Sequence, residues 1–244
     1  MQRMKCIISY DGTLFSGYQV QVEKRTVQSE LEAVLTKMHK KAVKVVASGR
    51  TDAGVHAIGQ VIHFDTSLDI PTDRWVQAMN AMLPKDIAVL SAEVVSETFH
   101  ARFDAKGKTY KYEIDLSDIR NPLMRNYAFH YPYPVDKSRI EEAISYTLGT
   151  HDFSSFCAAN TDVKDKVRTI HSIVCEQEGN LLRLTYTGNG FLYNMVRILT
   201  GTLIEIGTGR REPEEMSYII AKRDRSAAGK TAPAQGLYLE KVFY

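Results

Sequence analysis

VKVVASGRTDAGVHAIGQVIHFDTS, residues 43–67, joins two apolar runs through a loop of small and polar residues. Its β-branched and aromatic side chains predict strands over 43–49 and 61–67. The residues between them, ASGRTDAGVHA (47–57), then form a strand-to-strand connection, a common place for functional residues. Glycine and alanine there let the backbone turn sharply and let a partner approach closely. This loop is therefore the first candidate for a working site.

Working outward, short apolar runs alternate with amphipathic segments. Thr26 and the pair Ser138 and Glu141 are positioned to cap helices. The strand and helix order repeats in a similar way, although no sequence repeat proves it, and predicts an α+β fold of two halves with a mostly antiparallel sheet. Strands are predicted over 5–10, 87–95, 108–115, 171–177, 181–188 and 236–244, and helices over 26–41, 73–83, 138–149, 190–207 and 214–224.

A proline-bearing stretch at 125–138 joins the two predicted halves, residues 1–125 and 126–244. The first half carries the 47–57 loop, and the second carries an apolar helix that contains an arginine. We expect the halves to work together as one catalytic unit.

The composition of the chain limits the classes of function that it can have. The 244 residues are 44% hydrophobic and 25% charged, with a formal net charge of +2, so a real core is expected and nucleic acid is neither demanded nor excluded. Three distant cysteines without a C-x-x-C pair argue against a zinc site and for reduced thiols. No signal peptide, membrane span, P-loop, G-x-G-x-x-G, H-E-x-x-H or G-x-S-x-G motif occurs, which predicts a cytoplasmic protein without a membrane partner.

In the loop, Asp52 stands without a neighbouring carboxylate. It can serve as a nucleophile, a base or an electrostatic partner, or it can simply form a turn with its own backbone. Arg50 can hold a phosphate or a base edge, or form a surface ion pair. His56 can contact a ribose or a base, or fill a structural position.

Two further stretches add chemistry. FHARFDAKGKTYKY (99–112) interleaves cations with aromatic rings, a pattern that RNA binding uses and that a strand with one charged face also shows. GNGFLYNMVRILTG (188–201) places Arg197 inside an apolar helix. A buried arginine requires an acceptor, for which Asp52 is a candidate, whereas an arginine at the helix edge would reach solvent.

Together these stretches resemble the tRNA pseudouridine synthase A family (TruA). The resemblance covers nearly the whole chain in the family's order. It rests on YDGTLFSGYQVQ (10–21), RTVQSELEAVL (25–35), ASGRTDAGVHA (47–57), FHARFDAKGKTYKYEI (99–114), HDFSSFCA (151–158) with VRTI (167–170), and GFLYNMVRILTG (190–201).

The resemblance implies the pseudouridine synthase fold, with two similar α/β halves, a mixed, mainly antiparallel central sheet and a cleft between the halves. It implies a homodimer that isomerises uridine to pseudouridine at positions 38, 39 and 40 of the tRNA anticodon stem-loop, without metal or cofactor. By position, Asp52 matches the catalytic aspartate and Arg197 the arginine that pairs with it. Substrate contacts are expected from Tyr110, Arg50, Thr51, His56, Arg102 and Lys108.

Three chemical routes stay open for Asp52: attack on the sugar carbon, attack on the uracil ring, or removal of a sugar proton to give a glycal. Two other functions also stay open. One is an RNA-binding module without catalysis, and the other is a related synthase that modifies other uridines.

Overall fold

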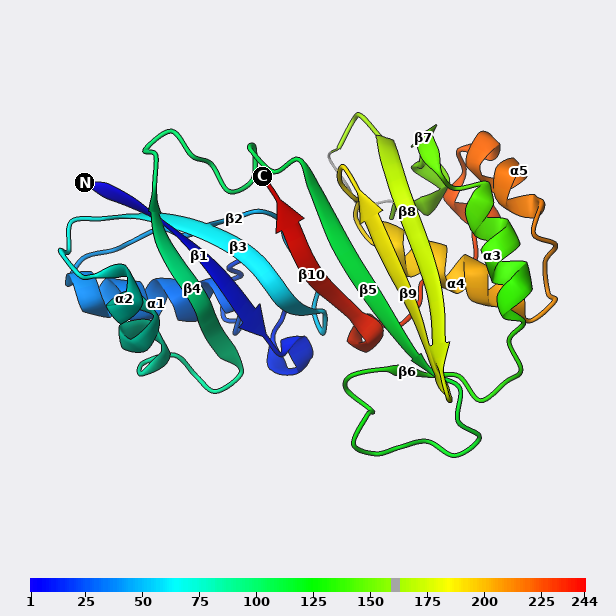
Figure 1. Ribbon diagram of the computed structural model, residues 1–244, viewed down its shortest axis with the longest axis horizontal. Helices are drawn as coiled ribbons and strands as arrows, with labels where there is room; N and C mark the ends of the chain where they lie inside the picture. The colour runs from blue at the N-terminus through cyan, green and yellow to red at the C-terminus, as the bar shows by residue number, and fades with distance from the viewer. Residues whose placement is uncertain (159–162) are drawn as a thin grey trace. The chain divides into compact units, whose positions relative to one another are not determined.

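The computed structural model describes residues 1–158 and 163–244 (Figure 1). The chain forms two compact units. Unit 1 comprises residues 1–106 and 238–244, and unit 2 comprises residues 107–237. This division differs from the predicted boundary after residue 125, because the strand that starts at Gly107 pairs with later strands and the C-terminal strand pairs back into unit 1.

The sheet of unit 1 has the strand order β4-β1-β3-β10, with β2 added on β3. β1 runs antiparallel to both β3 and β4. β10 runs parallel to β3, with Tyr238 opposite His56, so the end of the chain lies beside the strand that follows the Asp52 loop. The strands are β1 (Gln2–Tyr10), β2 (Val46–Ala47), β3 (His56–Thr66), β4 (Ile87–Val95) and β10 (Leu237–Phe243).

Two helices cover this sheet, α1 (Val27–His39), which runs behind the strands in Figure 1, and α2 (Thr72–Asn80). Thr26 caps α1 as predicted, since its hydroxyl accepts from the Ser29 N–H. α1 buries Leu31 and Leu35, because apolar residues four apart share one helix face. A short 3₁₀ turn, η1 (Gly12–Leu14), follows β1 and leads toward the Asp52 loop.

The sheet of unit 2 has the order β5-β9-β8-β7, and each neighbouring pair is antiparallel. β8 and β9 form the predicted hairpin, whose tip residue Gly179 has a φ of +57°. A short strand, β6, pairs with β5 in parallel. The strands are β5 (Gly107–Asp115), β6 (Phe129–His130), β7 (Gly149–Asp152), β8 (Val167–Glu178) and β9 (Leu181–Gly188).

The core of unit 2 forms around α4, which is buried along most of its length and passes behind β8 and β9 in Figure 1. Leu199 and Leu203 are fully buried, as is Tyr186 on β9. The helical elements are α3 (Lys137–Ser145), α4 (Met195–Gly207), α5 (Glu215–Lys222), and the 3₁₀ turns η2 (Ser154–Phe156), η3 (Arg225–Ala227) and η4 (Ala234–Gly236).

The α+β class and the mainly antiparallel pairing are therefore confirmed within each unit. Several local predictions were wrong. The strand predicted over 43–49 is only Val46–Ala47, the strand predicted over 61–67 begins at His56, and the helix predicted over 138–149 ends at Ser145, with Gly149 starting β7. Asp136, not Ser138, caps α3, because its carboxylate accepts from the Ser138 N–H. α4 begins at Met195 rather than at residue 190, since Asn194 adopts a left-handed backbone with a φ of +61°.

No helix within residues 1–158 and 163–244 is long and apolar enough to cross a membrane. The three cysteines are buried free thiols, and burial raises the pKa of Cys6 to about 12 and that of Cys175 to about 11.

Candidate active site

Asp52 lies at the start of a tight turn. Its carbonyl accepts a hydrogen bond from the Val55 N–H at 3.1 Å, with Ala53 and Gly54 between them. Gly54 has a φ of +78°, a conformation that favours glycine at this place in a turn. The Asp52 side chain is half-buried. The small residues that follow Asp52 therefore let the chain reverse just after the carboxylate.

The residue before Asp52 is anchored from two sides. Thr51 is 7% exposed, and its hydroxyl lies 2.7 Å from the Tyr10 hydroxyl at the end of β1. Its carbonyl accepts from the Tyr18 N–H at 3.0 Å. Burial raises the pKa of Tyr10 to about 12, so its hydroxyl keeps its proton at neutral pH. Both contacts fix the backbone that enters Asp52.

The residues after Asp52 are held by η1. A Cβ on Gly12 would collide with the Val55 carbonyl oxygen, so the two backbones are in direct contact. The Gly12 N–H lies 3.0 Å from Nδ1 of His56, so this ring contacts η1 directly. The Asp11 carboxylate lies 3.2 Å from the same nitrogen.

Thr51 and His56 therefore support the loop from inside unit 1. His56 is only 2% exposed, and its ring stacks on Tyr238 at 4.7 Å. For His56 the structural alternative that the sequence left open thus has direct support, and contact of Thr51 or His56 with RNA stays a prediction.

Arg50 and Arg102 lie on the surface of unit 1. The Arg102 guanidinium lies over the Phe103 ring at 5.9 Å, and Phe103 itself is 75% exposed. An exposed cation beside an exposed ring offers RNA a phosphate contact and a stacking surface together. Both arginines are exposed, and their contact with RNA stays a prediction.

Tyr110 and Lys108 are half-buried residues of β5 in unit 2. The Tyr110 ring meets Phe191 edge to face at 5.3 Å. Tyr112, on the same side of β5, is fully buried and its hydroxyl donates to the Pro233 carbonyl at 2.6 Å. Tyr110 thus stands on a strand that is itself fixed to the segment around Pro233.

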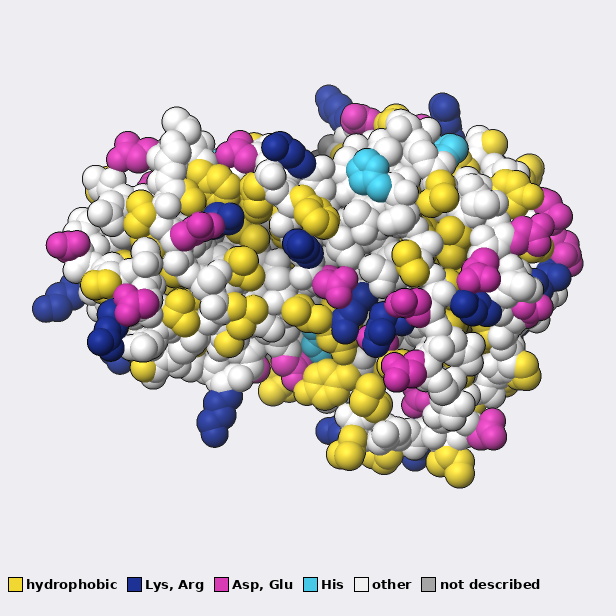
Figure 2. Space-filling view, in the orientation of Figure 1, with side chains coloured by type: hydrophobic (Ala, Val, Ile, Leu, Met, Phe, Trp, Pro, Cys, Tyr) yellow, Lys and Arg dark blue, Asp and Glu magenta, His cyan; other side chains and the backbone are white. Residues whose placement is uncertain are grey.

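The basic character of β5 is partly neutralised by its own neighbours. Lys111 and Arg183 lie 3.2 and 3.0 Å from the buried carboxylate of Glu113. Figure 2 shows cationic and anionic side chains side by side on this face of the sheet. Lys111 therefore belongs to a structural ion-pair cluster, which sequence pattern alone could not distinguish from an RNA-binding face.

Arg197 projects from the first turn of α4 and is half-buried. Its Nε donates to the Ala232 carbonyl at 2.8 Å, and its Nη1 donates to Oδ1 of Asn194 at 2.9 Å. The Ala232 N–H returns a bond to the Arg197 carbonyl at 3.0 Å. Arg197 is thus held against a neighbouring segment, and its pairing with Asp52 stays a prediction.

The segment that holds Arg197 is AGKTAP, residues 228–233, called the strap below. Sequence reasoning missed it, although two signals were present. Gly201 lies inside an apolar helix, where glycine is costly, and Glu205 interrupts the same apolar run. A Cβ on Gly201 would collide with the Lys230 carbonyl oxygen of the strap.

A surface cavity of about 600 Å³ in unit 2 contains none of the predicted site residues. It lies between β7 and α5, where Arg223 is 3.3 Å from the Asp152 carboxylate. Within the described residues, no group of three or more His, Cys, Asp or Glu side chains is arranged to hold a metal ion.

The family model described as "tRNA pseudouridine synthase" matches residues 6–104 and 143–244. The chain belongs to the tRNA pseudouridine synthase family. Membership makes the protein an isomerase that acts on uridine in tRNA.

Several relatives named "tRNA pseudouridine synthase A" align along almost the whole chain. The protein of Bacillus pumilus is 55% identical over 99% of each chain. The Geobacillus sp. protein is 54% identical over 100% of this chain and 98% of its own, and the Bacillus subtilis protein is 52% identical over 99% of each.

Among solved structures, a chain of a Cbf5–Nop10–Gar1 complex aligns with a TM-score of 0.35 and 12% identity over 82% of this chain. This chain spans about half (54%) of that one, and the likeness is too low to support a conclusion.

Proposed function

We propose that this synthase converts uridines 38, 39 and 40 of the tRNA anticodon stem-loop to pseudouridine, with Asp52 as the catalytic residue. The observation that carries the proposal is the rigid turn at Asp52, which Tyr10, Gly12 and Tyr18 hold from both sides. A fixed carboxylate next to small residues suits a substrate whose sugar and base must come close to it.

The chemistry requires the C–N glycosidic bond to break, the uracil to turn over, and a C–C bond to form at the same sugar carbon. Atoms and charge balance without an added group, since the proton lost from C5 is matched by the proton gained at the uracil nitrogen. The target base lies in a stacked stem and must first be flipped out, at a cost of a few kcal/mol. Contacts to the RNA backbone offset that cost.

Asp52 acts as a carboxylate, either as a nucleophile or as a base. We propose that Arg197 favours this charged form and orients it, because a guanidinium can donate two parallel bonds to a carboxylate. Tyr110 would stack on the flipped uracil and assist proton transfer from C5 with its hydroxyl. Asp52 comes from unit 1 while Tyr110 and Arg197 come from unit 2, so both units together are proposed as one catalytic unit.

Exposed Arg50 and Arg102 and half-buried Lys108 are proposed to contact the tRNA backbone, which supplies the electrostatic part of affinity. Thr51 and His56 hold the loop, and they are also proposed to contact the tRNA where it enters the site.

We further propose a cytoplasmic homodimer. Free thiols are typical of a reducing compartment, and the three cysteines are unpaired. Support for a dimer comes from large apolar side chains on the surface of unit 2 between β5 and α3, since such side chains often mark interaction sites. Ile119 and Leu123 are 82% and 79% exposed, and Tyr133 is 57% exposed.

Incubation of the purified protein with tRNA transcripts, followed by pseudouridine mapping, tests the proposed reaction and position. We expect product at positions 38, 39 and 40, and release of tritium from uracil labelled at C5. Product at other uridines only would assign the enzyme to a related synthase. Tritium release that never exceeds background would contradict catalysis and would favour an RNA-binding module without activity.

Asp52→Asn is the matched catalytic control, because it keeps the side-chain shape and removes the negative charge. We expect product formation to fall by at least about 1000-fold while tRNA binding stays within about twofold. Efficient turnover by this variant would overturn the role of Asp52. Tyr110→Phe should bind tRNA normally and form product slowly, and full activity would remove the proposed role of the hydroxyl.

A further inference from the structure

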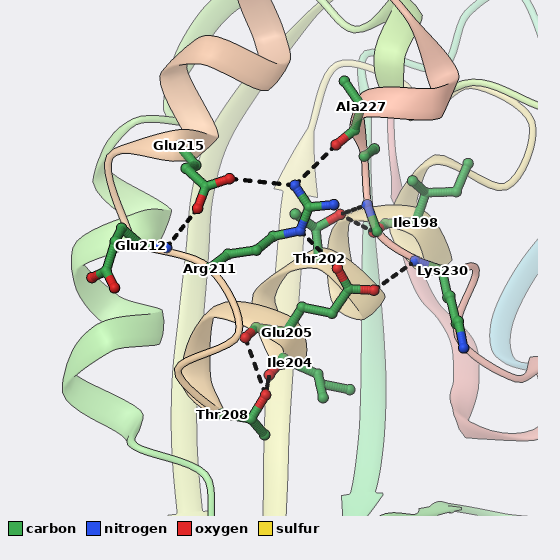
Figure 3. Close-up of polar contacts among 12 residues, drawn as sticks. Ile198, Thr202, Ile204, Glu205, Thr208, Arg211, Glu212, Glu215, Ala227 and Lys230 are labelled. Atoms are coloured by element: carbon green, nitrogen blue, oxygen red, sulfur yellow. Dashed lines mark hydrogen bonds and ion pairs between the residues drawn. The ribbon is translucent and has the colours of Figure 1, made fainter.

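Glu205 ties the strap to α4 two helical turns beyond Arg197 (Figure 3). Its Oε1 accepts the Lys230 N–H at 3.0 Å, and its Oε2 lies 2.7 Å from Nε of Arg211. Both side chains are largely buried, with 19% of Glu205 and 24% of Arg211 exposed. One carboxylate therefore binds the strap backbone and a cation at the same time.

Arg211 extends this contact to the start of the strap. Its Nη1 donates to the Ala227 carbonyl at 3.1 Å and lies 3.5 Å from the Glu215 carboxylate on α5. Arg225 adds a bond from Nη1 to the Gly229 carbonyl at 3.0 Å. Two guanidinium groups thus hold the carbonyl of Ala227, the last residue of η3, and that of Gly229 within the strap.

The strap and the helix also touch through their backbones. The Gly229 N–H donates to Oγ1 of Thr202 at 2.9 Å, and that hydroxyl is oriented by its own bond to the Ile198 carbonyl. A Cβ on Gly229 would come within 2.9 Å of Cα of Thr202 and of Cδ of Glu205. The strap therefore has very little room to slide along α4.

The strap that these contacts hold also binds Arg197 directly. The strap residue Ala232, two positions beyond Lys230, exchanges bonds with Arg197: its carbonyl accepts from Nε and its N–H donates to the Arg197 carbonyl. A displacement of the strap at Lys230 would move the acceptor that orients the guanidinium. Catalytic geometry is sensitive to shifts of about 1 Å, so such a displacement would reach the chemistry.

We infer that Glu205 is a positioning residue for Arg197, and that it acts by clamping the strap between Arg211 and the α4 helix. This inference rests on the proposed catalytic role of Arg197. Glu205 does not need to contact RNA, because its effect is transmitted through the Lys230 and Ala232 backbone. A purely structural glutamate would stabilise unit 2 without changing the rate of the chemical step.

Glu205→Gln separates the two roles. The amide can still accept from the Lys230 N–H but cannot form an ion pair with Arg211. We expect single-turnover pseudouridine formation to slow by about tenfold, with tRNA binding within about twofold of the original protein. Glu205→Asp retains the charge and should recover part of the lost rate.

Asp65→Asn is the matched control for stability. Asp65 forms a two-point pair with Arg3 in unit 1, at 2.7 and 2.9 Å, and touches neither the strap nor the Asp52 loop. This variant should lower the thermal unfolding midpoint about as much as Glu205→Gln and leave the single-turnover rate unchanged. Equal rates for Glu205→Gln and Asp65→Asn would overturn the inference.

The combination of Glu205→Gln with Arg197→Lys tests the route. If Glu205 acts through Arg197, its effect should shrink from about tenfold to less than about twofold once Arg197 is replaced, as expected for coupled residues. An undiminished effect would show that Glu205 acts by another path. Failure of the original protein to form pseudouridine would instead refute the proposed function, so the two failures are distinguishable.

Discussion

The Asp52 loop and the strap that contacts Arg197 are both held in a fixed position, but by different interactions. Around Asp52, neutral hydrogen bonds and a backbone contact at Gly12 hold the chain. Around Arg197, the strap is held by a partly buried ion pair between Glu205 and Arg211, again with a close glycine contact at Gly201. In both regions a second segment, distant in sequence, fixes the functional one.

The difference in interactions follows from the functional side chain of each region, a carboxylate in the loop and a guanidinium beside the strap. In the proposed site the Asp52 carboxylate is paired with Arg197, and hydrogen bonds between neutral groups hold the loop that carries it. An arginine that orients another group needs its guanidinium fixed in direction, which a rigid carbonyl acceptor provides. We therefore expect the strap to depend on charge and the loop to depend on shape.

The largest effect is expected at the guanidinium itself. Arg197→Lys should lower kcat by about 100-fold, because a point charge cannot reproduce the planar bonds to Ala232 and Asn194. Single-turnover rates over several pH values provide the measurement. Rates equal to those of the original protein at every pH would contradict a pair between Arg197 and Asp52.

Gly12→Ala and Gly201→Ala disrupt the two close backbone contacts, at the Asp52 loop and at the strap, directly. Each new Cβ would collide with a carbonyl oxygen, of Val55 or of Lys230, so each segment must shift. We expect a loss of about tenfold in kcat and a lower unfolding midpoint, by roughly 5 to 10 °C, in calorimetry.

Gly179→Ala is the control for this pair. It lies at the hairpin tip of β8 and β9 with a φ of +57° and no atom within 4 Å of the added Cβ, so it strains the backbone far from either region. Its midpoint should fall while kcat stays constant. A similar kcat loss in all three variants would mean that general destabilisation, not positioning, governs the rate.

The smallest effects are expected from two hydroxyl deletions. Tyr10→Phe removes the bond to Thr51, next to Asp52, and Tyr112→Phe removes the bond to Pro233 in the strap. Each should cost about 1 kcal/mol of unfolding free energy. We expect kcat to fall about fivefold for Tyr10→Phe and less than twofold for Tyr112→Phe, because Glu205 and Thr202 still hold the strap.

Tyr186→Phe provides the reference for these deletions, since its buried hydroxyl bonds Thr200 at 2.8 Å and touches neither the loop nor the strap. Denaturant unfolding and steady-state kinetics on the three variants give both quantities. A larger rate loss for Tyr112→Phe than for Tyr10→Phe would reverse the order that the comparison predicts.

Local patterns in the sequence determined several secondary-structure elements of this protein and its family. The cap at Thr26, the apolar face of α1 and the β8–β9 hairpin depend on residues within a few positions of each other, so periodicity and turn chemistry suffice to predict them. The motifs around Asp52, Tyr110 and Arg197 also sufficed for the family, since they recur in order along the chain.

Only the tertiary structure decided how those residues are held. The burial of His56 against Tyr238, the contact of Arg197 with Ala232 and the clamp at Glu205 join segments separated by 25 to 182 positions. Whether a glutamate in an apolar helix meets a cation or solvent depends on which segment packs there. That packing is set by the whole core, because each partner is stable only when the others are in place.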